Sequence, residues 1–287
     1  MPYSLNIPTT GLFELNGPKI MAILNITPDS FYQTEELAHI SESPQAAIDL
    51  AARFIEQGAH ILDIGGMSSK PGAELISASE ELDRVIPVIE ALFKAFPTTP
   101  ISIDTVHSSV CQAAAKAGAG ILNDISAGKF DDNLIPIAAK YGMPYILMHM
   151  QGKPQEMQEK PSYENVVTSV FDFFSSNSSL CLKAGIKDLI LDPGFGFGKT
   201  IDHNYKLLGS LSVFETLGFP ILAGVSRKSM IWKVLNVEPD QALHGTGVLH
   251  TLALIQGALL LRVHDPKEAT QVCTLVDTYS RAMHSDD

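Results

Sequence analysis

The chain has 287 residues, of which 45% are hydrophobic and 18% are charged, and its formal net charge is −12. This composition can bury a large core, so long disordered segments are not expected. The negative charge argues against nucleic acid and against an anionic membrane as main partners, because both attract basic surfaces. An anionic small molecule stays possible if the few cations converge at one place.

The three cysteines are odd in number, lie far apart and form no C-x-x-C pair. This usage is typical of a reducing cytoplasm and argues against a cysteine-based metal site. No basic segment leads into an apolar run at the N-terminus, so we expect no secretory signal. The most apolar stretch, residues 249–264, is interrupted by His250 and Gln256 and is too short to span a bilayer. We interpret it as a buried helix that runs into a buried strand.

Eight short apolar runs predict strands, and each is followed by an amphipathic segment of helical length. The predicted strands are 19–27, 60–65, 100–104, 120–124, 144–150, 188–194, 220–226 and 259–264. The predicted helices are 44–59, 78–96, 108–119, 132–142, 163–185, 204–218, 241–257 and 266–283. Several helices end in glycine, as expected where a left-handed residue ends a helix. Eight alternations predict a parallel α/β barrel in one domain, with an open doubly wound sheet as the alternative.

A glycine-rich segment, "LDPGFGFGKT" (191–200), invites comparison with nucleotide-binding loops. The phosphate loop requires glycine four residues before Gly-Lys-Ser/Thr, but Pro193 occupies that position and offers no N–H. The dinucleotide fingerprint also fails, because its third glycine would fall on Lys199 or Ile201. The segment therefore predicts neither kind of nucleotide site.

Polar residues close nearly every predicted strand, at the end where barrels of this kind carry their active sites. They are Asn25, Asp63, Asp104, Asn123, Asp124, His149, Asp192, Ser226, Arg227, Lys228, Arg262 and His264. A single aspartate in such a place often only caps the next helix. Helix caps alone would not bring acids, amides and cations together at one end of the barrel. We therefore interpret the set as a functional site, and we call this end of the barrel its mouth.

The set divides by chemistry. Asp104, Asn123, Asp192 and Lys228 combine acceptors and donors that suit a flat heterocycle with an aminopyrimidinone edge. Arg262 and His264 lie two residues apart on the last strand, so their side chains point the same way. Phosphate sites of such barrels lie near the seventh and eighth strands, so this pair predicts an anion clamp.

Two predicted strands are followed by loops longer than usual, 25–44 and 65–81. Connections in α/β units commonly have two to six residues, so loops of this length favour lids or binding loops over plain insertions.

Eight motifs, in order and one at each strand end, resemble those of the dihydropteroate synthase family of the folate pathway. They are "ILNITPDSF" (23–31), "LDIGG" (62–66), "SIDT" (102–105), "NDI" (123–125), "LMHMQG" (147–152), "DPGFGFGK" (192–199), "SRKS" (226–229) and "RVHD" (262–265). The resemblance runs from about residue 18 to the last helix. It implies a (β/α)₈ TIM barrel, a single pterin-binding domain over 1–287 whose core covers about 18–285.

Members of that family join para-aminobenzoate to 6-hydroxymethyl-7,8-dihydropterin pyrophosphate, release pyrophosphate and are targets of sulfonamides. The resemblance implies a pterin site formed by Asp104, Asn123, Met148, Asp192, Phe197 and Lys228. It implies a pyrophosphate site formed by Asn25, Lys70, Arg262 and His264, with Asp63 close by and Mg²⁺ bound through Asn25. It implies an aminobenzoate site formed by Phe31, Ser69, Pro71, Ser226 and Lys228. It also implies a homodimer. In the loop "DPGFGFGK", which would bring Asp192 and Phe197 to the pterin, it implies that the glycines allow the backbone to approach closely.

An aniline nitrogen is a weak nucleophile, so most catalytic assistance must reach the leaving group. Mg²⁺, Arg262, His264 and Lys70 would spread the charge that builds on pyrophosphate, in the cation-like, dissociative reaction attributed to the family. Asp63 or Asp104 would favour the positive charge on the pterin methylene. On this interpretation Asp63, Asp104, Lys228, Arg262 and His264 are the catalytic residues.

The sequence departs from the family pattern in both long loops. The second usually reads Gly-Gly-Glu-Ser-Thr-Arg-Pro-Gly, whereas residues 65–72 here read Gly-Gly-Met-Ser-Ser-Lys-Pro-Gly. Lys70 keeps the charge of arginine but loses its bidentate fork. In the first loop, Tyr32, Gln33 and Thr34 replace small residues. We expect these changes to alter aminobenzoate affinity and the response to sulfonamides.

Two rival functions remain open. A methyltetrahydrofolate-dependent methyltransferase domain binds its pterin with similar acids and amides, but it needs no pyrophosphate clamp. A binding or regulatory paralogue would keep the strand-end residues and lose turnover.

Overall fold

The computed structural model describes residues 3–26, 44–67, 75–152, 156–159 and 161–284. Eight parallel strands close into a barrel in the order β10-β3-β4-β5-β6-β7-β8-β9. Their bounds are β3 (Lys19–Asn25), β4 (Ile61–Gly65), β5 (Ile101–Asp104), β6 (Ile121–Asp124), β7 (Tyr145–Met148), β8 (Leu189–Asp192), β9 (Ile221–Ala223) and β10 (Ala258–Val263). Seven lie inside their predicted runs, and β10 begins one residue before the predicted 259–264, so the predicted barrel is confirmed and the open sheet is excluded.

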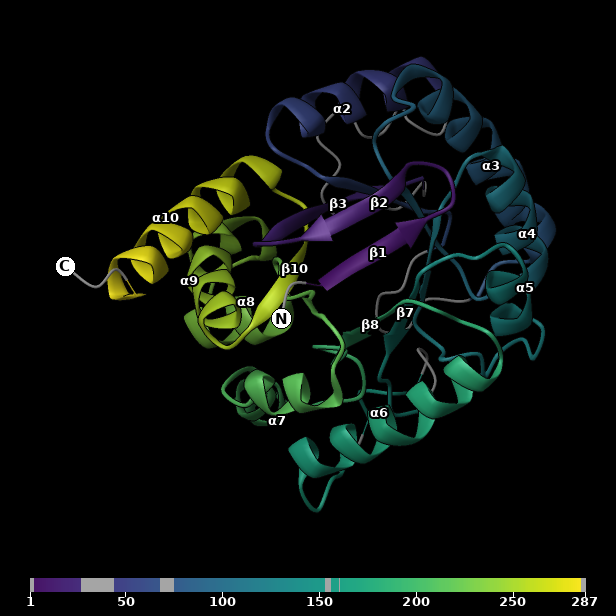
Figure 1. The fold of residues 1–287 in the computed structure, drawn as a ribbon. Coiled ribbons are helices and arrows are strands. Elements are labelled where there is room, and N and C mark those ends of the chain that lie inside the picture. The colour runs from purple at the N-terminus through teal and green to yellow at the C-terminus, as the bar shows by residue number, and fades with distance from the viewer. Residues whose placement is uncertain (1–2, 27–43, 68–74, 153–155, 160, 285–287) are drawn as a thin grey trace.

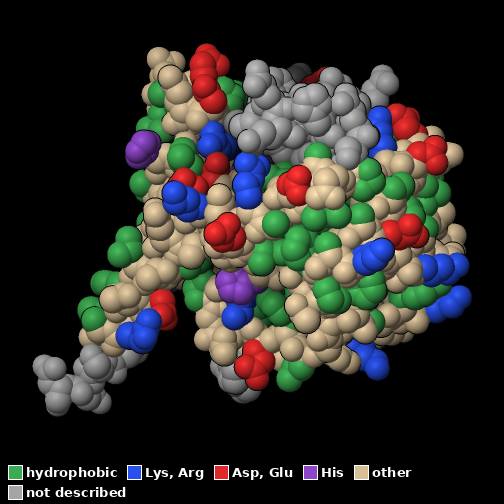
Figure 2. Space-filling model, turned by 90° about the horizontal axis from the view of Figure 1, so that it is seen from above, with side chains coloured by type: hydrophobic (Ala, Val, Ile, Leu, Met, Phe, Trp, Pro, Cys, Tyr) green, Lys and Arg blue, Asp and Glu red, His purple; other side chains and the backbone are tan. Residues whose placement is uncertain are grey.

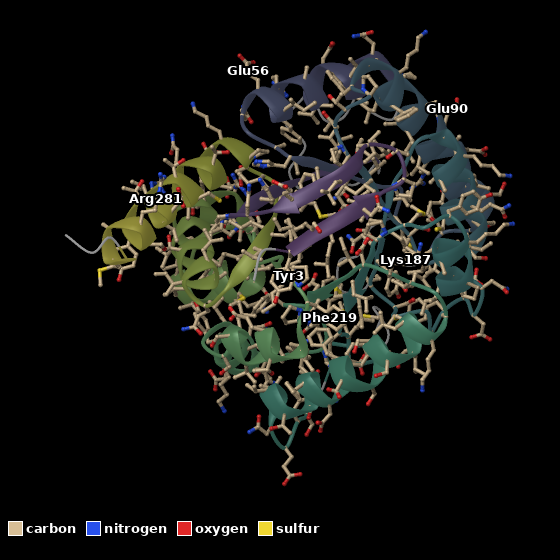
Figure 3. The ribbon with its side chains drawn as sticks, viewed as in Figure 1. Tyr3, Glu56, Glu90, Lys187, Phe219 and Arg281 are labelled. Carbon is tan, nitrogen blue, oxygen red and sulfur yellow. The ribbon has the colours of Figure 1, made fainter. Side chains whose placement is uncertain are left out.

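Helices surround the barrel, as Figure 1 shows. They are α2 (Pro44–Glu56), α3 (Ala78–Ala95), α4 (Ser108–Ala117), α5 (Leu134–Lys140), α6 (Val166–Lys183), α7 (Ile201–Leu208), α8 (Ser229–Leu235), α9 (Leu243–Ile255) and α10 (Pro266–His284). Their apolar faces pack on the strands, while charged side chains such as Glu56 and Glu90 point outward (Figure 3). None of the described helices is long and apolar enough to cross a membrane.

The glycines that precede strands end helices as predicted. Gly58, Gly118, Gly142, Gly185, Gly218 and Gly257 all have positive φ. At Gly118 a Cβ atom would also lie 2.3 Å from Cγ of Phe93. Both the left-handed backbone and the close packing therefore require glycine at that turn.

The structure differs from the predicted helices between β8 and α9. The predicted helix 204–218 is two elements, because α7 ends at Leu208 and a 3₁₀ helix, η1 (Leu211–Leu217), follows Gly209 and Ser210. Sequence reasoning also missed α8 and the short 3₁₀ helix η2 (Pro239–Ala242), which precede α9. Glycine and serine disfavour a continuous helix there, and the apolar spacing across them misled the prediction.

An N-terminal hairpin that the sequence reasoning did not predict closes one end of the barrel. Strands β1 (Tyr3–Ile7) and β2 (Gly11–Leu15) pair antiparallel and lie across the barrel end nearest the viewer in Figure 1. Leu5, Ile7 and Leu15 are buried against the first inward-facing residues of the strands, among them Met21 and Ile61. This contact plugs the barrel at the N-terminal ends of its strands.

Replacing Ile7 with alanine should lower the free energy of unfolding by about 2–5 kcal/mol, because it removes a fully buried side chain from this plug. Activity at 25 °C should change little, since the hairpin lies at the end opposite the polar mouth. Urea denaturation of Ile7→Ala and Leu12→Ala compares a buried with an exposed position on one hairpin; Leu12 is 66% exposed. Equal losses of stability in the two variants would contradict this description of the plug.

Candidate active site

The interior of the barrel changes from apolar to polar along its axis. Ile61, Ile121 and Leu260 belong to the apolar layer that the hairpin covers. Two residues further along the same strands stand Asp63, Asn123 and Arg262. Side chains two apart on a strand share a face, so the second layer also points into the barrel. The sequence pattern therefore places a polar group above an apolar floor, at the carboxyl end of the strands.

Arg262 joins two aspartates from other strands. Its Nε lies 2.6 Å from Oδ2 of Asp63, and its Nη2 lies 2.7 Å from Oδ2 of Asp104. Asn123 also donates to Oδ2 of Asp63, at 3.2 Å. Asp63 is fully buried, and its Oδ1 has no hydrogen-bond partner among the described residues. The structure thus brings together four predicted residues, with Arg262 bound to carboxylates.

Burial perturbs the ionisation of this group. It raises the pKa of Asp104 to about 7, although Arg262 opposes the shift; the nearby charges of Asp63, Asp124 and Asp192 add to it. It raises the pKa of Asp192 as well, against the opposing charge of Lys228. Burial also lowers the pKa of Lys228 to about 8. Perturbed groups gathered in this way are typical of functional sites.

Lys228 and Asp192 face each other across Gly224. A Cβ atom on Gly224 would lie 3.7 Å from Nζ of Lys228 and 4.0 Å from Oδ2 of Asp192. Asp192 also accepts a hydrogen bond from the backbone N–H of Gly194 through Oδ1, at 2.8 Å. Glycine at position 224 therefore adds no side chain to the space beside this acceptor and this donor.

An apolar cluster forms one wall beside the polar group. Met148 and Phe197, both predicted for the pterin site, lie in it with Val106 and Ile125. Nζ of Lys228 lies 4.8 Å from the centroid of the Phe197 ring, which joins the wall to the polar group. Sequence reasoning missed Val106 and Ile125. The sequence offers little indication of their role, since each is a single apolar residue that follows shortly after an acid at a strand end.

Asn25 stands beside Asp104. A Cβ atom on Gly65 would lie 3.0 Å from Oδ1 of Asn25 and 3.9 Å from Oδ2 of Asp104. Glycine at this position leaves room for both oxygen atoms. No group of three or more His, Cys, Asp or Glu suited to a metal occurs in the part of the chain that the structure describes.

His264 lies next to Ser226. Its backbone N–H donates to Oγ of Ser226 at 3.2 Å, and its Nδ1 lies 3.1 Å from the same oxygen. Burial lowers the pKa of His264 to about 3, and the positive charge of Arg262 adds to the shift. The imidazole is therefore neutral at pH 7. The anion clamp made by Arg262 and His264 stays a prediction. In such a clamp only Arg262 would carry a positive charge.

Arg227 and Asp124, two other strand-end residues, hold the protein's own loops. The guanidinium of Arg227 pairs with both carboxylate oxygens of Asp265, at 2.7 and 2.8 Å. Asp124 accepts from the backbone of Ser126 and Gly128 and from the hydroxyl of Tyr145. Asp124 therefore holds the turn after β6, and it does not cap the next helix, because the N-cap of α5 is Asn133. Arg227 fixes the segment that carries Ser226 and Lys228, a role the sequence reasoning missed.

The glycines of the β8–α7 loop permit close approach, as predicted. A Cβ atom on Gly194 would lie 2.0 Å from the carbonyl oxygen of His149. One on Gly198 would lie 2.2 Å from the carbonyl oxygen of Gln151. Both glycines also have positive φ. The backbone that approaches is the protein's own, at the end of β7, so the loop packs directly on the neighbouring strand end.

Four predicted site residues, Phe31, Ser69, Lys70 and Pro71, lie outside the described residues. Of the five residues predicted for the aminobenzoate site, the structure describes only Ser226 and Lys228. The roles of Phe31, Ser69 and Pro71 in that site, and of Lys70 in the pyrophosphate site, stay predictions.

The geometry of this mouth can be compared with known proteins. The sequence model of a family described as pterin binding enzymes matches residues 21–264. The chain belongs to this family. Dihydropteroate synthase of Escherichia coli K12 is 44% identical to it over 266 residues, which is 92% of each chain. That of Haemophilus influenzae is 44% identical over 88% of this chain and 90% of its own. The resemblance drawn from the eight motifs is thereby confirmed.

Solved structures agree with the sequences. Dihydropteroate synthase of Yersinia pestis, solved with a sulfonamide drug, superposes with a TM-score of 0.91 at 41% identity, covering 97% of this chain and 99% of that one. The enzyme of Xanthomonas albilineans, solved with 4-aminobenzoic acid, has a TM-score of 0.87 at 36% identity and covers all of both chains. The chain is thus an enzyme whose relatives are dihydropteroate synthases.

Glu81 is a buried acid at the edge of this mouth. The hydroxyl of Thr105, which follows Asp104, donates to its Oε2 at 2.9 Å, and its Oε1 has no hydrogen-bond partner among the described residues. Burial raises the pKa of Glu81 to about 7, although the bond from Thr105 opposes the shift. The folded protein therefore holds this proton more tightly than the unfolded chain does.

The free energy of unfolding should depend on pH through the proton on Glu81. The contribution of protonated Glu81 is complete below its ordinary pKa of 4.5 and is lost as pH rises to about 7. Glu81→Gln removes the titration while keeping an acceptor for Thr105. From pH 4.5 to pH 7.5, unfolding free energies from urea denaturation should fall more in the wild type than in the variant, by on the order of 3 kcal/mol. Parallel pH profiles would show that Glu81 does not titrate in this range.

Proposed function

We propose that this chain is a dihydropteroate synthase of folate biosynthesis. It would condense 6-hydroxymethyl-7,8-dihydropterin pyrophosphate with para-aminobenzoate to give 7,8-dihydropteroate and pyrophosphate. The observation that carries this assignment is the convergence of Asp104, Asn123, Asp192 and Lys228 at one end of the barrel, in a chain that is 44% identical to a dihydropteroate synthase.

The pterin would lie flat against Met148 and Phe197, with its polar edge toward Asn123, Asp192 and Lys228. A buried acceptor, Asp192, and a half-buried donor, Lys228, beside Gly224 suit an edge that carries both N–H and C=O groups. Few other groups could satisfy these side chains at once, and an unsatisfied buried polar group costs about 1–3 kcal/mol. This cost would give the pocket its selectivity for the ring.

The chemistry requires departure of pyrophosphate and attack by an aniline nitrogen. The methylene carbon would lose its bond to the diphosphate oxygen, form a bond to the amine nitrogen, and that nitrogen would then release a proton. Asp63 and the ionised form of Asp104 would place negative charge near the ring, which would stabilise a cation-like methylene. Arg262 would exchange its contact with Asp104 for the diphosphate, and neutral His264 would donate an N–H.

Mg²⁺ is the cofactor that we propose. When bound it would neutralise charge on the departing diphosphate. Asn25 would hold it through Oδ1, an oxygen ligand of the kind that Mg²⁺ accepts, with diphosphate oxygens and water completing the shell. A site of this kind fits a mouth in which Asn25 Oδ1 and a carboxylate of Asp104 face the same space beside Gly65.

The reaction is tested by pyrophosphate release from the dihydropterin pyrophosphate and Mg²⁺, with and without para-aminobenzoate. Release that requires aminobenzoate and yields dihydropteroate is expected. Asp192→Asn should lower kcat/KM about 10- to 100-fold, since it removes the charge that faces Lys228. Asp188→Asn is the matched control, because Asp188 binds the hairpin through Asn6. Pterin binding without release would favour the paralogue or the methyltransferase.

The metal site gives a separate prediction. Asn25→Ala should raise the Mg²⁺ concentration for half-maximal activity about tenfold or more, because loss of even an outer-shell partner weakens metal affinity about 10- to 100-fold and Asn25 would bind the metal directly. Binding of the pterin alcohol, which lacks the diphosphate, should not change. Activity that survives EDTA treatment, or an unchanged Mg²⁺ requirement in Asn25→Ala, would remove Asn25 from this role.

We further propose a homodimer that works in the cytoplasm. Apolar side chains at least 43% exposed recur at helical spacing on α9 and α10: Val248, Leu252, Ile255, Leu275, Tyr279 and Met283. Two more, Val234 and Leu235, lie on α8, which packs against α9. Figure 2 shows such side chains along the projecting α10 at its lower left. The three unpaired cysteines suit a reducing compartment.

Sedimentation should find twice the mass of one chain. Ile255→Asp combined with Leu275→Asp should shift the protein to the mass of one chain, because charges would be buried in an apolar interface. Leu12→Asp, on the exposed face of the hairpin, is the control and should leave the mass unchanged. A single-chain mass for the wild type would exclude the dimer.

A further inference from the structure

The loop between β8 and α7 is held by side chains along its length. Five consecutive carbonyl groups, from residue 194 to residue 198, each accept a hydrogen bond from a side chain. The donors are Lys199 to Gly194 (2.8 Å) and Phe197 (3.0 Å), Lys228 to Phe195 (2.5 Å), Gln158 to Gly196, and Tyr163 to Gly198 (2.9 Å). Such complete use of a loop's carbonyls leaves its backbone little freedom.

Lys199 is central to this arrangement. Its side chain is only 2% exposed, and besides two loop carbonyls it contacts Nδ1 of His149 at 3.0 Å and the carbonyl oxygen of His149 at 3.2 Å. Burial lowers the pKa of His149 to about 2, so its imidazole is neutral and can accept from the ammonium group. Lys199 therefore ties the loop to the end of β7, directly after Met148.

The position of Nζ argues against a role as base or nucleophile. A buried ammonium is costly unless acceptors surround it, and here four acceptor atoms lie within 3.2 Å. The charge is thus used for binding the loop. Burial lowers the pKa of Lys199, yet no reacting group could reach an atom enclosed by the protein's own backbone.

The loop presents its side chains to the other face. Phe197 forms part of the apolar wall with Met148, and the N–H of Gly194 fixes Oδ1 of Asp192. Two groups proposed for the pterin thus depend on a backbone that Lys199 holds from behind. Of the two described residues predicted for aminobenzoate, Ser226 contacts His264, while Lys228 donates to the carbonyl oxygen of Phe195 in this loop and also belongs to the predicted pterin site.

We propose that Lys199 is a positioning residue for the pterin half of the site, which it serves by locking the loop 193–198 onto the end of β7. This inference rests on the proposed function, because it takes the occupant of the pocket to be the pterin. Its expected signature is a selective loss of pterin affinity, with aminobenzoate affinity retained.

Lys199→Met keeps the length of the side chain and removes its charge and donors. We expect the KM for the dihydropterin pyrophosphate and the Kd for 6-hydroxymethylpterin to rise about tenfold or more, as for loss of a charge-assisted bond. The KM for para-aminobenzoate should stay within about twofold. Lys206→Met, at an exposed lysine on α7, is the control and should leave all three constants unchanged.

Tyr163→Phe provides a second variant that removes one hydroxyl donor from the same loop, at Gly198, without burying or deleting a charge. Its pterin constants should rise about 2- to 5-fold, with aminobenzoate again unaffected. If Lys199→Met fails to fold, this variant decides the matter alone.

Unchanged pterin constants in a folded Lys199→Met, or equal losses for both substrates, would overturn the inference. So would an unchanged pterin Kd in Tyr163→Phe when Lys199→Met does not fold. Direct binding of 6-hydroxymethylpterin needs no turnover. A wild type that binds this pterin but makes no dihydropteroate would therefore refute the proposed reaction and still leave the role of Lys199 open to measurement.

Discussion

The arrangement of the mouth depends on the ion pairs of Arg262. This arginine lies on β10, its partners Asp63 and Asp104 lie on β4 and β5, and β3 stands between them in the barrel. Burying a charge is costly unless a partner compensates it, and Asp63 is fully buried. The arginine therefore allows two acids to stay at the centre of the barrel, where an apolar floor below them excludes water.

The other features of the site follow from this constraint. Glycine at positions 65 and 224 adds no side chain beside Asp104 and Asp192, and at position 65 a Cβ atom would lie as close as 3.0 Å to Oδ1 of Asn25. The apolar wall around Met148 and Phe197 adds apolar surface beside these polar groups, a combination that is typical of sites for flat heterocycles. Loops that carry Lys228 and Phe197 are fixed from behind, by Arg227 with Asp265 and by Lys199 with His149. Binding side chains and supporting side chains thus alternate along the same motifs.

Much of this could be predicted from the sequence. The barrel followed from eight apolar runs, and the polar mouth followed from residues such as Asp104 and Asn123 that close them. The regular alternation of apolar runs and helical segments predicts the barrel. The place of a polar residue at the end of a run predicts the site, because the carboxyl ends of all the strands meet at one end of a parallel barrel. The hairpin plug was missed, although "YSLNI" and "LFEL" alternate on either side of a turn that ends at Gly11. The partners of Arg262 and Lys199 could not be predicted, because sequence spacing does not show which side chains meet across a barrel.

The central claim is that Arg262 and Asp63 stabilise each other as a buried pair. A double-mutant cycle of Arg262→Met and Asp63→Asn, measured by urea denaturation, tests it most directly. Arg262→Met should destabilise the protein by about 3–5 kcal/mol, because it leaves the fully buried Asp63 without its counter-charge. Asp63→Asn should cost less, because Arg262 keeps Asp104 as a partner. The double variant should be clearly more stable than the sum of the two losses implies, with a coupling above about 1 kcal/mol. Losses that add within about 0.5 kcal/mol would contradict the account and remove the ion pair as the basis of the site.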